Sequence, residues 1–201
     1  MRYFFLILSI GFLPVDINAQ EISFKDTIAA YNLHRINMNK TGMKVLGSWG
    51  LVNIGVGCYS YYTTKQDEMK YFSEMNVLWG AVNTGIAAIS LASVRKEMAA
   101  NLNYEQSYQS YLSTKRLYLI NAGLDVIYIG AGVGLTAYSR NVKKNEAIYS
   151  GFGKSVAIQG VFLLLFDNIM FSAHHLDNSK WFRIMNEIRF TNKGIGYSHT
   201  F

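Results

Sequence analysis

Four strongly polar side chains stand near the middle of four long segments that otherwise carry almost no charge. Two of them are carboxyls, Asp125 and Asp167, and two are amides, Asn53 and Asn83. A charged side chain at the centre of a bilayer costs at least about 2.5 kcal/mol, so acids at such positions pair with other groups or bind protons or cations. Two interpretations stay open: a proton or cation site, or hydrogen bonds that fix the register of neighbouring helices.

Further polar residues accompany the two aspartates at helical spacing. Offsets of three, four and seven residues stay on one face of a helix. The segments around the two aspartates contain polar residues three, four, seven and eight positions from the aspartate. The candidate site is therefore a mid-membrane polar layer with a flanking polar face: Asn53, Asn83, Asp125 and Asp167 in the layer, and Asn121, Tyr128, Gln159 and His174 beside it.

The segments that position these residues have the length of membrane-spanning helices. About 20 residues of helix cross the roughly 30 Å hydrocarbon core of a bilayer. A soluble amphipathic helix would carry a charge every three or four residues, whereas these intervals carry one or none. The sequence therefore predicts an all-α fold, an integral membrane four-helix bundle with spans at about residues 45–64, 75–94, 117–139 and 155–176.

A phrase of the form Trp-Gly-x-Val-Asn-x-Gly occurs twice, at 49–55 and at 79–85. Because consecutive spans run antiparallel, we expect the two copies to meet about a local two-fold axis. The asparagines would then meet near the middle, and the tryptophans would lie toward opposite membrane surfaces. Pairs of small residues, Ala81 with Gly85 and Gly130 with Gly134, are predicted to be helix-packing faces.

The N-terminus has the pattern of a secretory signal peptide. Arg2 precedes an apolar stretch at 3–13 that is too short to span a membrane, and Ala19 is a candidate cleavage position. We expect a signal peptide at 1–19 and a single four-span membrane domain at 20–201. The alternative is that the segment is retained as an N-terminal anchor.

Both flanks of the spans are predicted to be surface elements. Residues 23–40 have the spacing of an amphipathic helix, lying on the membrane surface or on the bundle. The tail after residue 180 has the pattern of a short β-hairpin. A cleaved signal and the density of Lys and Arg in the short loops place both mature termini outside the cytoplasm, in a bacterial inner membrane.

Several chemistries are not expected from this sequence. The net charge of +6 comes without a nucleic-acid-binding motif, so we expect no nucleic acid partner. No Ser/His/Asp or Cys/His arrangement supports nucleophilic catalysis, and a lone Cys58 cannot form an internal disulfide. His174 and His175 point about 100° apart on a helix, so we expect neither a metal site nor a cofactor.

Four stretches carry a resemblance to a known kind of protein: MKVLGSWGLVNIGVG, INAGLDVIYIG, QGVFLLLFDNIMFSAHH and GIGYSHTF. Together they resemble a family of uncharacterised bacterial four-span membrane proteins with an N-terminal signal sequence, which implies no activity. The leading hypothesis is a non-enzymatic component of the bacterial envelope, in contact with the lipid bilayer and assembled with other membrane or periplasmic proteins. The alternative is a small proton- or ion-linked transporter or channel that uses the polar layer.

Overall fold

The computed structural model describes residues 17–191 and 194–197, with the side chains of residues 25–176. The elements follow in this order: α1 (Ile17–Thr63), α2 (Asp67–Ala99), α3 (Tyr104–Ser139), the short 3-10 helix η1 (Lys143–Asn145), α4 (Glu146–Glu187), β1 (Ile188–Thr191) and β2 (Gly194–Tyr197). The two four-residue strands pair antiparallel. Residues 192 and 193, where the predicted hairpin would turn, lie outside the described residues, as does almost all of the predicted signal peptide at 1–19.

The helices are long because little in the sequence interrupts them. The single proline, Pro14, precedes α1. Helix α3 begins at a capping box, in which Asn103 Oδ1 accepts a hydrogen bond from the Gln106 amide at 2.9 Å and the Gln106 side chain accepts one from the Asn103 amide at 3.0 Å. The short connections force consecutive helices to run antiparallel.

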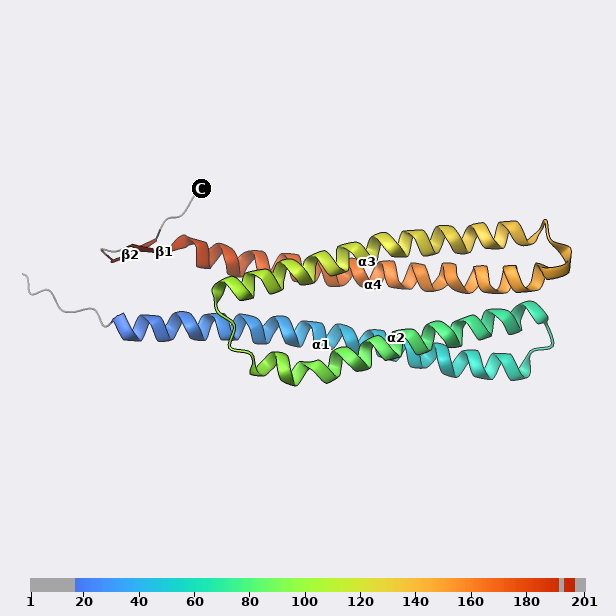
Figure 1. Cartoon of the computed structure of the whole chain (residues 1–201), viewed down its shortest axis with the longest axis horizontal. Helices are drawn as coiled ribbons and strands as arrows, with labels where there is room; N and C mark the ends of the chain where they lie inside the picture. Colours follow the sequence, from blue (N-terminus) through green and yellow to red (C-terminus); the bar gives the residue numbers. More distant parts are fainter. Residues whose placement is uncertain (1–16, 192–193, 198–201) are drawn as a thin grey trace, which may run out of the picture.

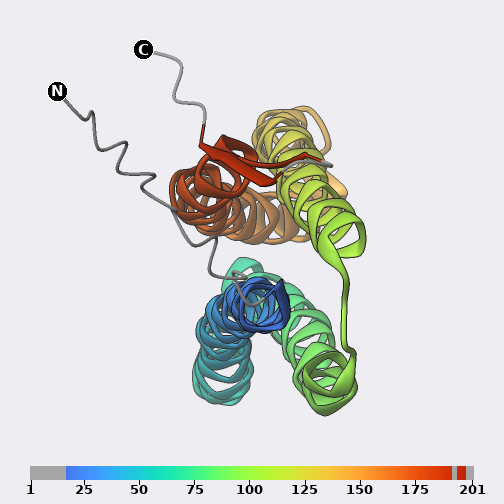
Figure 2. The same cartoon turned by 90° about the vertical axis from the view of Figure 1, so that its left-hand side faces the viewer.

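The four helices form two hairpins, α1 with α2 and α3 with α4 (Figure 1). The hairpins meet mainly through α2 and α4, whereas α2 and α3 pack little against each other although they are consecutive. Figure 2 shows the hairpins as two layers, joined by the connection from α2 to α3. Helices α1 and α4 continue past that connection, so the start of α1 and the end of α4 lie at the same end of the bundle (Figure 1).

The predicted N-terminal amphipathic helix at 23–40 is part of α1 and not a separate element. Helix α1 has 47 residues, which corresponds to about 70 Å at 1.5 Å per residue. No proline or glycine stands between residues 21 and 41, so nothing separates this segment from the span that follows. Its Ile28 and Tyr31 are buried against Tyr111 of α3, so the segment lies on the bundle.

Three helical segments are long and apolar enough to cross a membrane: Asp67–Ala99, Tyr104–Ser139 and Lys143–Leu176. They indicate a membrane protein. Helix α1 is not among them within the described residues, because glycine, serine and tyrosine alternate with its aliphatic residues over 45–64. That α1 crosses as the first of four spans stays a prediction.

The distribution of side chains is the reverse of that in a soluble protein. Gln159 and His174 are 0% exposed, and Asp125 is 3% exposed. Large aliphatic side chains face outward instead, with Ile127 63% and Ile169 66% exposed. Water-soluble proteins bury such residues, whereas a bundle in lipid turns them outward and keeps ionisable groups inside. The interior of this bundle is therefore polar along much of its length.

In each hairpin, one pair of glycines marks a point where the two helices come very close together. A Cβ atom added at Gly50 would lie 2.7 Å from the carbonyl oxygen of Gly80, and one added at Gly132 would lie 2.6 Å from that of Gly153. Contacts this short leave room only for glycine at the crossing points.

The repeated phrase is therefore a crossing of glycines and not a pairing of asparagines. A Cβ atom added at Gly50 would also lie 2.8 Å from the Thr84 amide nitrogen, and one added at Gly80 would lie 3.0 Å from that of Ile54. Trp49 therefore lies near the depth of Asn83, and Trp79 near that of Asn53, so both tryptophans stand within about a turn of the crossing and the two asparagines lie about a turn apart in depth. The predicted meeting of the asparagines and the predicted separation of the tryptophans are both wrong.

The predicted packing faces of small residues are also wrong within this chain. Cβ atoms added at Gly85, Gly130 and Gly134 would meet no neighbouring atom within 4 Å, and Ala81 is exposed. The glycines that pack lie on the opposite, polar side of these helices, where the hairpin partner stands.

Candidate functional site

Asp125 of α3 and Asp167 of α4 meet inside the bundle. Their carboxyl groups lie within hydrogen-bond reach of each other, and Asn121 lies within reach of Asp167. The two aspartates are 3% and 4% exposed. Two carboxylates in contact cannot both ionise cheaply. A pair in this arrangement can share a proton or hold a cation between its oxygens.

A cavity of about 750 Å³ opens onto this pair. It forms where α2 and α3 do not pack, and it runs from Glu97 and Arg116 near the connection of these helices to Trp79 and Tyr128. Asn83 lines the same cavity. The cavity thus leads from the polar end of the bundle to the acid pair.

Three buried polar atoms of residues that line this cavity have no hydrogen-bond partner among the described residues. They are Nε of Arg35, Nδ2 of Asn83 and Oδ2 of Asp125. Most buried polar atoms in proteins are satisfied, so each exception calls for an explanation. A water molecule or a ligand in the cavity would supply the missing partner.

Asn53 belongs to a different cluster, centred on Gln159 of α4. Gln159 Nε2 donates to Asn53 Oδ1 at 2.7 Å and to Asn76 Oδ1 at 3.0 Å, and Trp49 Nε1 donates to Gln159 Oε1 at 2.9 Å. Ser155 Oγ also donates to Asn76 Oδ1, at 2.8 Å. This Gln159 cluster joins α1, α2 and α4. The structure thus divides the predicted four-residue layer, with Asn53 in one part and the other three in the cavity.

Replacing Gln159 by leucine is expected to destabilise the bundle by at least about 2 kcal/mol, because each buried polar group left unpaired costs about 1–3 kcal/mol. Asn53, Asn76 and Trp49 all lose a partner. Thermal unfolding in detergent, followed by circular dichroism, measures the loss. The matched control is Asn168→Leu on the same helix, where the exposed amide bonds only the Leu164 carbonyl. An equal loss in both variants contradicts a structural role for the Gln159 cluster.

His174 lies toward the end of the bundle that holds the start of α1 and the end of α4. Its Nε2 is 2.8 Å from Asn39 Oδ1, and Tyr118 Oη donates to the same oxygen at 3.2 Å. The Tyr118 and His174 rings stack with centroids 5.7 Å apart. With the Gln159 cluster and the acid pair, these residues make a column of polar groups through the bundle interior.

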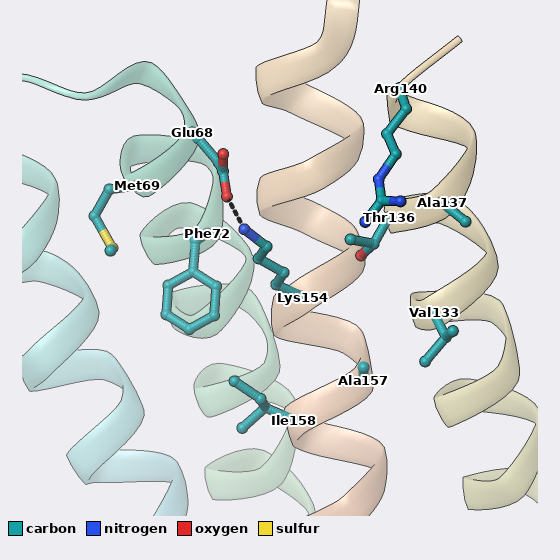
Figure 3. A pocket seen from close by; sticks show the side chains of 10 residues that line it. All are labelled: Glu68, Met69, Phe72, Val133, Thr136, Ala137, Arg140, Lys154, Ala157 and Ile158. Atoms are coloured by element: carbon teal, nitrogen blue, oxygen red, sulfur yellow. Dashed lines mark hydrogen bonds and ion pairs between the residues drawn. The ribbon is translucent and has the colours of Figure 1, made fainter. Parts of the chain in front are cut away.

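An aromatic contact stands between the acid-pair cavity and a second cavity. Trp79 of α2 packs edge to face on Tyr128 of α3, with ring centroids 5.1 Å apart. The second cavity, of about 520 Å³, lies on the other side of this contact, between the start of α2, the end of α3 and the start of α4. Figure 3 shows its lining, with charged groups at one end and apolar side chains further along. We call it the loop-end cavity.

Glu68 and Lys154 form an ion pair at the charged end of the loop-end cavity (Figure 3). The hydrogen bond from Lys154 lowers the pKa of Glu68 below its ordinary value. The pair is therefore ionised at neutral pH, and the stability it contributes is lost only as the pH falls through the lowered pKa. Because both side chains are partly exposed, that contribution is small.

Several residues of these clusters were not predicted as site residues from the sequence: Asn39, Glu68, Asn76, Lys154 and Ser155. The signal was present for some of them. Asn76 precedes Asn83 by seven residues, and Ser155 precedes Gln159 by four, so both pairs share a helix face. No spacing rule identifies Asn39 or the Glu68–Lys154 pair, since their partners come from distant segments.

Among the described side chains, those of residues 25–176, no group of three or more His, Cys, Asp or Glu is placed to hold a metal ion. A family model described as a family of unknown function (DUF6992) matches residues 45–168, more than half of the 201-residue chain. No curated protein and no solved structure matches the chain. The matched region covers the acid pair, the Gln159 cluster, the loop-end cavity and most of the lining of the acid-pair cavity.

Proposed function

Because the chain belongs to this family of unknown function, we propose from its geometry that it is a non-enzymatic membrane protein that binds a proton or small cation at the Asp125–Asp167 pair and conducts it through the bundle. The acid pair at the end of a 750 Å³ cavity carries this proposal. An ionisable pair inside apolar helices marks an ion or proton pathway by default.

The arrangement of the two cavities supports a conducted ion more than a permanently bound one. The acid-pair cavity approaches the middle of the bundle from one end, and the loop-end cavity approaches it from the other. Trp79 and Tyr128, which pack edge to face, line the acid-pair cavity at the end nearer to the loop-end cavity. A rotation of these two side chains is a smaller change than a movement of whole helices. The aromatic contact is therefore the proposed gate.

Ion flux into liposomes tests the proposal. The full chain is reconstituted, a pH gradient is imposed, and an entrapped pH-sensitive dye reports its decay, with parallel arms that impose gradients of Na⁺ or K⁺. We expect one of the three gradients to decay at least about ten-fold faster than in protein-free liposomes, which is the effect of a barrier lowered by about 1.4 kcal/mol. Decay at the protein-free rate in all three arms overturns the proposal.

A role in assembly with other membrane proteins is the second candidate. The open space at Gly130 and Gly134 favours it, because a helix from another protein can approach such positions closely. Specific co-purification from native membranes together with protein-free flux rates would make this candidate the leading one. For either role, we propose a bacterial inner membrane with both termini outside the cytoplasm. This is supported by the position of both described chain ends at one end of the bundle.

A further inference from the structure

The loop-end cavity is amphipathic along its length. Its charged end carries Glu68, Lys154 and Arg140 (Figure 3). Toward the middle of the bundle the lining becomes apolar, with Phe72, Val133 and Ile158, which Figure 3 shows beyond the charged groups. A ligand that fits this gradient has a charged head and an apolar tail.

The charge at the mouth of the cavity is positive. Glu68 is paired with Lys154, so these two side chains neutralise each other. Arg140 remains as an exposed cation, and the segment 139–154 carries four basic residues and one acidic residue. An arginine can bind a phosphate through two parallel hydrogen bonds. The head group that fits is therefore an anionic phosphate.

The apolar part of the cavity lies where α2 and α3 leave α4 uncovered. These helices pack little against each other, and Val133 and Ile158 on its walls are 58% and 49% exposed. Both belong to helices that are apolar enough to cross a membrane. An acyl chain from the surrounding bilayer can therefore lie in this groove beside the helices.

We infer that the loop-end cavity is a binding site for an anionic phospholipid, with its phosphate on Arg140 and one acyl chain along Phe72, Val133 and Ile158. Basic pockets between transmembrane helices near a charged leaflet bind anionic head groups in this way. The inference does not rest on ion conduction, and a lipid bound here would close the half of the proposed ion path that lies in this cavity. The lipid would fill the gap between α2 and α3 on the side of the Trp79–Tyr128 contact that lies away from the acid pair.

Native mass spectrometry of the full chain in detergent tests the site. Phosphatidylglycerol, phosphatidylcholine or inorganic phosphate is added at equal concentration, and the bound fraction is measured. We expect phosphatidylglycerol to bind at least about ten-fold more tightly than phosphatidylcholine, because only the former keeps an uncompensated negative charge. Inorganic phosphate is expected to leave no adduct and to displace no lipid. Equal binding of the two lipids, or displacement by phosphate, overturns the inference.

Two variants test the two parts of the site. Arg140→Gln is expected to lower phosphatidylglycerol binding about ten-fold, whereas Lys143→Gln, a matched loss of charge three residues away and outside the cavity lining, is expected to leave it unchanged. Ile158→Trp is expected to fill the groove and weaken both lipids, while unfolding measurements without added lipid show that the bundle persists. Equal losses for the two charge variants, or full binding by Ile158→Trp, contradict the proposed pose.

Discussion

Replacing Gly132 by alanine is expected to lower the free energy of unfolding by about 3 kcal/mol, at the upper end of the range for an overpacked site. The added methyl would lie 2.6 Å from the carbonyl oxygen of Gly153, and that oxygen belongs to the backbone of α4. A flexible side chain could rotate away, but a helix backbone must move as a whole. The change therefore spreads the α3–α4 hairpin at its closest point, which lies two turns along α3 from Asp125.

The matched control for this prediction is Gly130→Ala, two residues away on the same helix. Its Cβ atom would meet no neighbouring atom within 4 Å, and alanine favours a helix over glycine by up to about 1 kcal/mol. We therefore expect the control to be neutral or slightly more stable. Thermal unfolding in detergent compares the two, and a loss of 3 kcal/mol corresponds to about 6–12 °C for a chain of this size. Equal midpoints would contradict the glycine crossing.

The sequence predicts the helices well because their signals are local. Intervals of about twenty uncharged residues, bounded by charged ones, define the cores of α2, α3 and α4 without reference to their neighbours. The continuity of α1 is harder to predict, because an amphipathic segment and an apolar segment have different patterns but can still share one helix. Their junction contains no proline, and that absence was the available signal.

The arrangement of the site is less predictable, because it depends on the register between helices. Position within each span suggested one layer of four polar residues, but the Gly50–Gly80 and Gly132–Gly153 crossings set the actual depths. A seven-residue spacing of positions along a single helix predicts which residues are buried better than their place within the span does. The buried positions of α3 include Tyr111, Tyr118, Asp125, Gly132 and Ser139, all seven apart.

The spacing of buried positions also predicts which small residues lie in contact with the neighbouring helix. The buried positions of α2 are spaced by three and four: Ser73, Asn76, Gly80, Asn83 and Ala87. This is the spacing of a seam between antiparallel helices. Glycines that share the seam with polar residues lie at crossings, whereas Gly85, off the seam, faces open space. A GxxxG spacing alone, as in Gly130 and Gly134, does not show which partner a face has.

Neutralising either carboxyl of the acid pair is expected to lower ion flux by a large factor without lowering the stability of the bundle. Asp125→Asn and Asp167→Asn keep the shape of the side chains and remove their charge. Two carboxyls in contact cannot both ionise cheaply, and a neutral isostere at either position removes that cost. We therefore expect neither single variant to unfold more easily than the parent. If the pair conducts a proton or cation, each variant is expected to lose at least about ten-fold in flux.

The double variant separates a shared site from two independent residues. Because the carboxyls lie within hydrogen-bond reach of each other, the second substitution is expected to remove little flux beyond the first. Residues in contact are non-additive in this way, whereas distant residues add. Asn168→Leu on the outer face of α4 is the control and is expected to keep the flux of the parent, since its side chain is exposed and off the cavity lining. Destabilisation by each single variant with unchanged flux would make the pair a structural clasp between α3 and α4, and conduction through it would be contradicted.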